Sequence, residues 1–172
     1  MASAPDQRAA LIDQASLRLD LLLRRLEAGA PVSFAAPGEE PSPEQTLQAE
    51  LSALGEGRRE PEPDFLHQLL RQLDRRVETR DAAGRILATS DIGFAGDTRT
   101  HLEADTDADV LRRHARRFER ELAALHQRRL TIAAALHMAA KLAAAAGSGN
   151  PLLALPAAWR FISQVAAQAK AD

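Results

Sequence analysis

The sequence predicts a mainly α protein, a helical bundle or coiled coil with a small β-hairpin or three-stranded insertion. Ala and Leu supply most of the apolar residues while aromatic residues make up only 3% of the chain, a composition typical of helix cores. Apolar residues repeat at heptad spacing over residues 111–143, and a Thr-, Ile- and Gly-rich segment interrupts the helical patterns. The 172 residues suffice for one domain, or for one domain with an appendage.

Residues 1–30 are predicted to form an N-terminal amphipathic helix. Ser3 can cap its start, and Gly29 can end it. Apolar residues follow at alternating spacings of three and four, which places them on one helix face: Ile12, Ala15, Leu19, Leu22 and Leu26. We therefore expect this face to be buried.

Residues 31–63 are predicted to form a Pro/Glu-rich tether that contains one short helix. Six of the nine prolines lie there, and residues 31–64 hold eight acidic side chains. Ser42, Pro43 and Gln45 match a capping box, in which Ser and Gln each bond to the backbone of the other. Gly55 is expected to end the helix.

Residues 64–104 are predicted to contain a helix followed by a β-hairpin. Asp64 opens a pattern in which Leu66, Leu69, Leu70, Leu73 and Val77 share one helix side. The next residues change to a strand pattern with two Gly-containing turns. The expected strands are 77–80 and 85–89, with a third possible at 97–102.

Residues 105–172 are predicted to form a long heptad helix and a C-terminal apolar helix, separated by Gly147, Gly149 and Pro151. Two arrangements fit: a helical hairpin within one chain, or a multi-helix oligomer. In the oligomer, a polar residue in the seam would set register or subunit number. That residue is Arg129, within the predicted oligomer seam of Leu111, Ala115, Phe118, Leu122, Leu125, Arg129, Ile132 and Leu136.

The C-terminal region 130–169 carries only two basic residues, Lys141 and Arg160. Its apolar side chains are expected to contact a partner, a second copy or a membrane surface, or to line a lipid-holding chamber in an oligomer. A peripheral contact with the inner face of the membrane would use the same residues as a contact with a protein. These are Leu152, Leu155, Trp159, Phe161 and Ile162.

Arginines concentrate in the first half of the long helix, between Arg112 and Arg129. Arg binds phosphate well, so a small regulator that binds nucleic acid is one alternative. A net charge of −2 and the scarcity of aromatic residues argue against nucleic-acid binding, and no known nucleic-acid-binding motif accompanies these arginines. A solvated face, or one paired with the acidic residues 31–64, is the simpler interpretation.

No pattern predicts catalysis, a metal or a cofactor. The absence of cysteine excludes disulfides, thiolate catalysis and cysteine-ligated zinc or iron–sulfur centres. Asp105, Asp107 and Asp109 resemble the start of a calcium loop, but they are better explained as a negative helix N-terminus. An acid–base set of Asp97, His101 and Glu103 rests on proximity in sequence alone. We therefore expect a protein that is not an enzyme.

We therefore expect the function to depend on surfaces that bind partners. The leading hypothesis is a scaffold or adaptor subunit that forms a homo-oligomer through its long helix and presents its N-terminal helix to a larger protein complex. Peripheral membrane attachment and nucleic-acid binding are the alternatives. The chain has no run of 18 uninterrupted apolar residues and no basic-then-apolar leader pattern, so a cytoplasmic location is expected.

Overall fold

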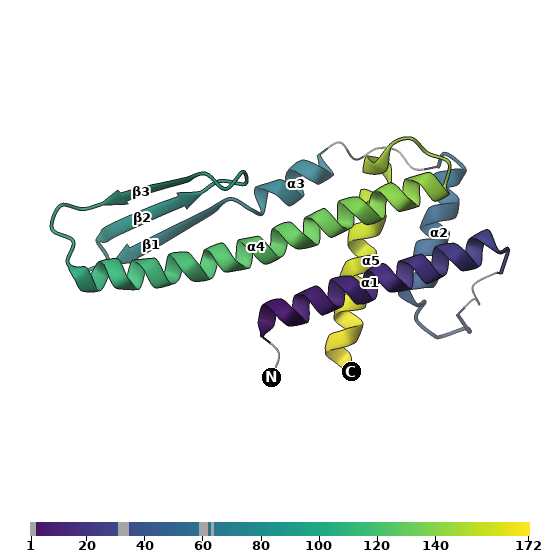
Figure 1. Cartoon of the computed structure of the whole chain (residues 1–172), viewed down its shortest axis with the longest axis horizontal. Helices are drawn as coiled ribbons and strands as arrows, with labels where there is room; N and C mark the ends of the chain where they lie inside the picture. Colours follow the sequence, from purple (N-terminus) through teal and green to yellow (C-terminus); the bar gives the residue numbers. More distant parts are fainter. Residues whose placement is uncertain (1–2, 31–34, 59–61, 63) are drawn as a thin grey trace. The chain divides into compact units, whose positions relative to one another are not determined.

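The computed structural model describes residues 3–30, 35–58, 62 and 64–172. In these ranges the chain forms five α-helices and one three-stranded antiparallel sheet, so the predicted mainly α fold with a small sheet is confirmed. Figure 1 shows the elements in chain order. They are α1 (Ala4–Glu27), α2 (Pro43–Gly55), α3 (Phe65–Arg71), β1 (Arg75–Arg80), β2 (Ile86–Ile92), β3 (Thr98–Leu102), α4 (Ala108–Ala145), a 3₁₀ turn (Pro151–Leu153) and α5 (Leu155–Ala171).

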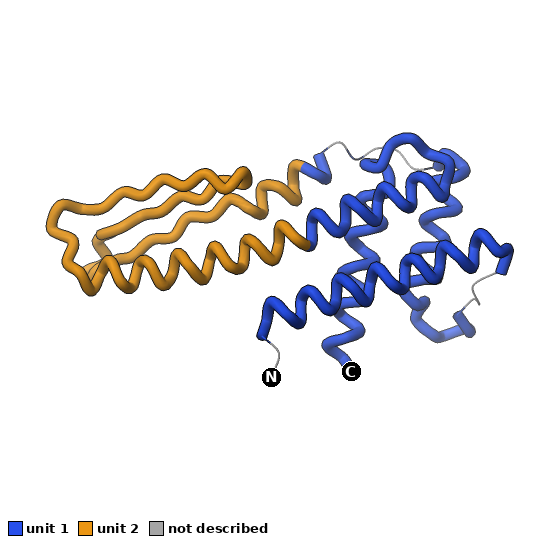
Figure 2. Tube along the Cα trace, viewed as in Figure 1, with its two compact units in different colours: residues 1–66, 131–172 blue, residues 67–130 orange. Residues whose placement is uncertain are grey.

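The chain divides into two compact units (Figure 2). Unit 1 comprises residues 1–66 and 131–172, and unit 2 comprises residues 67–130. The second boundary falls within α4 and within the segment 105–172 that the sequence grouped together. Residues 108–130 of α4 belong to the unit that contains the sheet, and residues 131–145 belong to the helical unit.

Unit 1 is a packed set of helices in which α5 contacts both α1 and α2. Small Ala side chains let the helix backbones approach closely. Among the described residues of unit 1, Phe161 is the only buried aromatic side chain. Polar contacts also join helices of this unit: the guanidinium of Arg18 in α1 binds both carboxylate oxygens of Glu44 in α2, and Lys141 of α4 lies 2.9 Å from Asp20 of α1. Other buried residues of unit 1 include Ala15, Leu19, Leu22, Leu47, Met138, Leu142, Leu155 and Val165.

Local capping fixes where the first two helices begin. The Ser42 backbone N–H donates to Gln45 Oε1 at 2.8 Å, and the Gln45 N–H donates to Ser42 Oγ at 3.2 Å. Ser3 and Asp6 form the equivalent capping box at the start of α1. The predicted starts of both helices are confirmed. Residues 31–34 and 59–61 of the predicted tether, and Pro63, lie outside the described residues.

Unit 2 is a three-stranded sheet with one face packed on residues 108–130 of α4. The strand order is β1-β2-β3, and both pairings are antiparallel. Side chains of β1 and β2 alternate between buried and accessible positions, as expected for a sheet covered on one face. The buried side chains of unit 2 are Leu69 of α3, Leu73 between α3 and β1, Val77 and Thr79 of β1, Ala88, Ser90 and Ile92 of β2, and Val110, His114 and Leu125 of α4.

The helix predicted from Asp64 ends earlier in the structure than the spacing of Leu66 to Val77 indicates, because α3 ends at Arg71. Val77 belongs to β1, as the predicted strand 77–80 requires, and it pairs with Ser90 of β2. The helical spacing was therefore misleading only over its last turns. Pairing with β2 satisfies the backbone of Arg75 onward, and tertiary pairing outweighs a weak local preference.

None of the helices in the described ranges combines the length and the apolar character needed to cross a membrane.

Candidate functional site

The predicted oligomer seam divides into an exposed half and a buried half. In unit 2, Leu111 and Leu122 remain 40% and 37% exposed, Ala115 is exposed and Phe118 is half-buried. Further along α4, the seam residues are covered by the protein itself. Leu125 is buried in unit 2, Ile132 is buried in unit 1, and Leu136 of unit 1 is half-buried. We call Leu111, Ala115, Phe118 and Leu122 the apolar flank of α4.

Helix geometry explains this division. An α-helix has 3.6 residues per turn, so a strict seven-residue repeat drifts by about 20° per heptad around the helix. The residues of α4 that face the sheet are Val110, His114 and Leu125, a set displaced around the helix from Leu111 and Leu122. The apolar flank therefore borders the buried face and does not enter it.

The apolar flank lies on the β3 side of α4. On the opposite side of the helix, Arg117 and Arg120 border a surface depression of about 320 Å³ together with Arg76 of β1. Arg129 follows Leu111 by 18 residues, or five helical turns, and therefore shares its helix face. The Arg129 guanidinium reaches the connection between β2 and β3.

Strand β3 is exposed along its whole length. Its residues Thr98, Thr100 and Leu102 pair with Ile92, Ser90 and Ala88, the buried residues of β2. The same three β3 residues thus point to the helix side of the sheet, since paired residues project from the same face. Leu102 is nevertheless 44% exposed. Helix α4 covers β1 and β2, and it leaves β3 uncovered.

The outer edge of β3 carries backbone groups available for pairing. Gly93 N–H donates to Asp97 O at 2.9 Å, and Glu103 N–H donates to Leu87 O at 3.0 Å. Because hydrogen-bonded positions alternate along an antiparallel strand, the odd-numbered residues 97–103 bond to β2. The N–H and C=O groups of Thr98, Thr100 and Leu102 therefore point away from the sheet.

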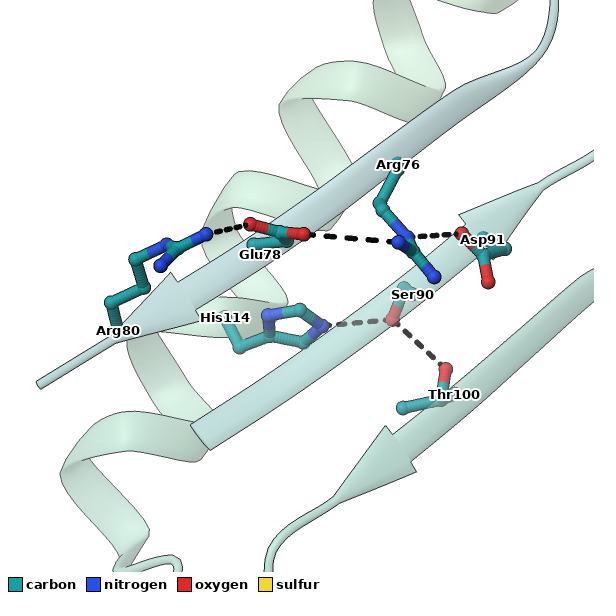
Figure 3. Close-up of polar contacts among 7 residues, drawn as sticks. All are labelled: Arg76, Glu78, Arg80, Ser90, Asp91, Thr100 and His114. Carbon is teal, nitrogen blue, oxygen red and sulfur yellow. Dashed lines mark hydrogen bonds and ion pairs between the residues drawn. The ribbon is translucent and has the colours of Figure 1, made fainter. Parts of the chain in front are cut away.

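The opposite edge, β1, is protected by charge and by an irregularity. Arg76 Nε lies 2.9 Å from Asp91, and Arg80 lies 2.8 Å from Glu78 (Figure 3). The register shifts between Thr79 and Arg80. Charged side chains and bulges are common means of keeping sheet edges from pairing. Strand β3 has an unbroken register with β2 and only one charged residue, Arg99.

The side chain of Arg129 is occupied within its own unit. Its Nη2 atom lies 3.4 Å from Gly93 O and 3.3 Å from Phe94 O. Gly96 also lies beside it: a Cβ added to Gly96 would be 3.7 Å from the guanidinium nitrogens. Gly96 has a φ of +89°, which favours glycine. Contacts with backbone carbonyls of the β2–β3 connection thus explain why a polar residue occupies this position of the apolar seam. Its predicted role in setting oligomer register stays a prediction.

The centre of the sheet holds a hydrogen-bonded chain of polar side chains under β1 and β2. His114 Nδ1 lies 2.8 Å from Thr79 Oγ1, and His114 Nε2 lies 2.8 Å from Ser90 Oγ. Ser90 Oγ is in turn 2.9 Å from Thr100 Oγ1 (Figure 3). Burial lowers the pKa of His114, and the nearby positive charge of Arg117 lowers it further. Both effects favour a neutral imidazole.

This imidazole–hydroxyl pair is a poor candidate for catalysis, because Ser90 is only 1% exposed and no substrate can reach its oxygen. The acid–base set expected from Asp97, His101 and Glu103 is only partly assembled. His101 Nε2 lies 3.8 Å from Glu103 Oε1. Asp97 precedes the start of β3 and lies four positions before His101, so about 13 Å of extended chain separates the two.

Asp107 acts as a helix cap, because its Oδ1 accepts a hydrogen bond from Val110 N–H at 2.9 Å. Within the described ranges, no group of three or more His, Cys, Asp or Glu side chains is arranged to hold a metal ion.

Four arginines on one side of α4 have no ion pair with any described residue. They are Arg113, Arg116, Arg117 and Arg120, which are exposed and spaced three, one and three residues apart. Five other arginines of unit 2 have acidic partners, as Arg112 does with Asp109. Two acidic residues of the segment 31–64 are paired within unit 1, where Glu44 binds Arg18 and Glu50 binds Arg160.

The predicted membrane or partner contacts of the last helix are mostly internal. Leu155, Phe161 and Ile162 are buried in unit 1, Trp159 is half-buried, and Leu152 is 44% exposed. A lipid or protein contact through these residues stays a prediction, and in this structure it would begin at Leu152 and Trp159.

Unit 1 contains a cavity between α2, α4 and the start of α5. Its volume of about 20 Å³ is enough for a single water molecule. The walls are mostly apolar: Leu47, Glu50, Leu51, Leu54, Glu62, Leu142, Leu153, Ala154, Pro156 and Ala157.

No family model, curated protein or solved structure matches this chain. Function must therefore be inferred from the surfaces described above. Among these, the apolar flank of α4 and the neighbouring β3 lie on the same side of unit 2.

Sequence reasoning identified the flank residues but missed two features. The first is the exposure of β3, which depends on how much of the sheet α4 covers and so cannot be seen in the sequence of the strand. The His114 contacts join residues 24 and 35 positions apart, and no short-range pattern reveals such pairs.

Proposed function

We propose that this protein is a non-enzymatic scaffold or adaptor subunit of the cytoplasm that self-associates through the apolar flank of α4. The supporting observation is the exposure of Leu111, Ala115 and Leu122 in a row with the half-buried Phe118. A contiguous apolar row on an otherwise charged helix favours a protein contact over solvation. A second copy of the flank supplies a matching surface at heptad spacing, giving a coiled-coil type contact.

The flank suits a contact between copies because it repeats every three or four residues over three turns of helix. Side chains at this spacing pack as knobs into holes of a facing helix. Burial of a Leu side chain contributes about 1.5–3 kcal/mol, so a few such residues from each copy are enough for a measurable association.

The test is the mass in solution by light scattering across a concentration series. We expect the full chain to show a multiple of 18.6 kDa. Leu122→Asp should return the monomer, because it places a charge in the apolar contact. Ala123→Asp is the matched control, since Ala123 is an exposed neighbour outside the flank. A wild-type monomer throughout, or an unchanged mass for Leu122→Asp, would overturn the proposal.

The adaptor role also requires a surface for a different protein. Helix α1 packs on α5 and α2 through Ala15, Leu19 and Leu22, and leaves Leu17 and Leu21 61% and 50% exposed. These two leucines, one turn apart, are the partner-facing part of the proposal. Replacing both with Ser should abolish partner capture while the self-association mass stays the same.

A second candidate function is binding of a polyanion such as nucleic acid through the four unpaired arginines. The observation that favours it is the absence of an acidic partner for Arg113, Arg116, Arg117 and Arg120 among the described residues. Binding to a labelled duplex should weaken steeply with salt, and should be lost when Arg113, Arg116 and Arg120 become Gln. Binding that survives this triple substitution would remove the candidate.

A further inference from the structure

We propose that β3 is also part of the self-association surface and pairs antiparallel with β3 of a second copy, joining the two sheets into one of six strands. This inference rests on the proposed function, because it specifies the interface through which the copies associate. It adds a backbone contact to the apolar contact of α4, and it names a register.

The edge of β3 has the chemistry for such pairing. The N–H and C=O groups of Thr98, Thr100 and Leu102 point outward, and the strand contains neither proline nor glycine. Exposed, regular edges of this kind readily accept another strand. Strand β3 lacks the register shift of β1 and carries one charged residue, Arg99, where β1 carries four.

The sequence of β3 favours its own copy as the occupant. When two identical strands pair antiparallel about His101, Arg99 faces Glu103 of the second copy, and the reciprocal pair forms as well. Arg99 has no ion pair among the described residues, and Glu103 makes only exposed contacts at 3.7 and 3.8 Å. Opposite charges directly across two strands are favourable, and here the two-fold symmetry forms the pair twice.

The same register satisfies the outward backbone groups. Thr100 N–H donates to Leu102 O of the second copy, and Leu102 N–H of that copy donates to Thr100 O. The symmetric pair doubles these to about four hydrogen bonds. The alternative register, centred on Thr100, would instead place Arg99 opposite His101, which offers no opposite charge.

The pairing also brings the helices to one side. A two-fold axis perpendicular to the joined sheet leaves both copies of α4 on the same face. The apolar flank lies on the β3 side of α4, so the two flanks would face one another beneath the paired strands. Thr98, Thr100 and Leu102, which now project uncovered on the helix side, would line the space between them.

Cysteine cross-linking tests the register, because the native chain contains no cysteine. His101→Cys places two thiols opposite one another at the two-fold axis, in a pair whose Cα atoms would lie about 4.5 Å apart. That separation is suitable for a disulfide, so mild oxidation should give a covalent dimer on a non-reducing gel. Thr89→Cys is the matched control: it pairs with His101 from the adjacent strand, and is too far from its own copy to cross-link.

A charge exchange tests the ion pairs. Arg99→Glu and Glu103→Arg should each raise the dimer dissociation constant roughly 5- to 10-fold, because each creates two like-charge pairs. The double variant should return it to within about twofold of wild type. Urea unfolding of each variant checks that the fold is intact.

The outcomes separate this inference from the proposed function. Cross-linking at His101→Cys together with rescue by the double variant supports β3 pairing. A dimer that Leu122→Asp dissociates, but that neither cross-links nor responds to the charge exchange, overturns β3 pairing and leaves self-association through α4 intact. A wild-type chain that is monomeric at all concentrations overturns both.

Discussion

The imidazole of His114 lies 2.8 Å from the hydroxyl oxygen of Ser90, and this contact joins α4 to the middle strand of the sheet. A neutral imidazole has one donor and one acceptor nitrogen, and it is matched by hydroxyls on both sides. The packing of sheet on helix in unit 2 thus depends on a polar group at its centre. Polar groups buried in this way stabilise when they are bonded and are costly to leave unbonded.

Protonation of His114 should destabilise the protein. The folded-state pKa is lowered by burial and by Arg117, whereas the unfolded chain binds the proton with the ordinary pKa near 6.5. The contribution is therefore fully present above pH 6.5 and is lost as the pH falls below it. We expect wild type to lose more stability than His114→Gln between pH 7.5 and 5 in urea unfolding. At pH 7.5, His114→Gln should itself cost about 1–2 kcal/mol. Equal pH slopes for the two proteins would contradict this assignment.

The Arg18–Glu44 pair should make unit 1 sensitive to stronger acid. Burial alone would raise the pKa of Glu44, but the hydrogen bonds from Arg18 and from the Glu44 backbone, with the Arg18 charge, lower it overall. The pair therefore stabilises above the unfolded pKa of about 4.5, and this stability is lost as the pH falls through the folded pKa. Glu44→Gln should cost roughly 1 kcal/mol at pH 7 and lessen the loss of stability below pH 4.5. Glu39→Gln, at an exposed position, serves as control and should change little.

Two leucines three residues apart in the seam should behave oppositely. Leu125 is 2% exposed and Leu122 is 37% exposed. Leu125→Ala should lower the free energy of unfolding by about 3 kcal/mol, because it leaves a cavity in unit 2. Leu122→Ala should change it by less than about 1 kcal/mol in the dilute monomer, but should weaken self-association. Similar unfolding costs for the two variants would show that the flank is buried within the monomer.

Arg129→Met should distinguish a local role from one in assembly. If the guanidinium mainly holds the β2–β3 connection through Gly93 O and Phe94 O, its loss should cost about 1 kcal/mol and leave the mass in solution unchanged. Hydrogen exchange of residues 93–97 should accelerate in the variant. A changed subunit number with unaltered exchange would instead support the role predicted from the heptad pattern.

Much of the secondary structure follows from local chemistry. Ser3 and Ser42 begin helices because their hydroxyls bond to backbone groups three residues along, an interaction that depends only on neighbouring residues. The Gly-containing turns likewise place the strands of the insertion. The spacing from Leu66 to Val77 failed as a helix signal beyond Arg71, because the pairing of β1 with β2, from Arg75 onward, is a long-range interaction that helical spacing does not detect.

The candidate site was only half visible in the sequence. Heptad spacing identified Leu111 and Leu122 as one row with Leu125 and Ile132, yet spacing cannot say which residues of a row the chain itself covers. That outcome depends on the drift of a seven-residue repeat around an α-helix and on the position of the sheet. The exposure of β3 has the same origin, since one helix covers two strands and leaves the third open.

By itself, the sequence determined where the first two helices begin, which residues are apolar, and which chemistry is excluded by the absence of cysteine. Tertiary structure alone decided that His114 is buried between two hydroxyls, that Arg129 contacts the β2–β3 connection, and that the apolar flank and β3 remain uncovered. The physical reason is range: caps and turns act over three or four residues, whereas burial depends on elements brought together from distant parts of the chain.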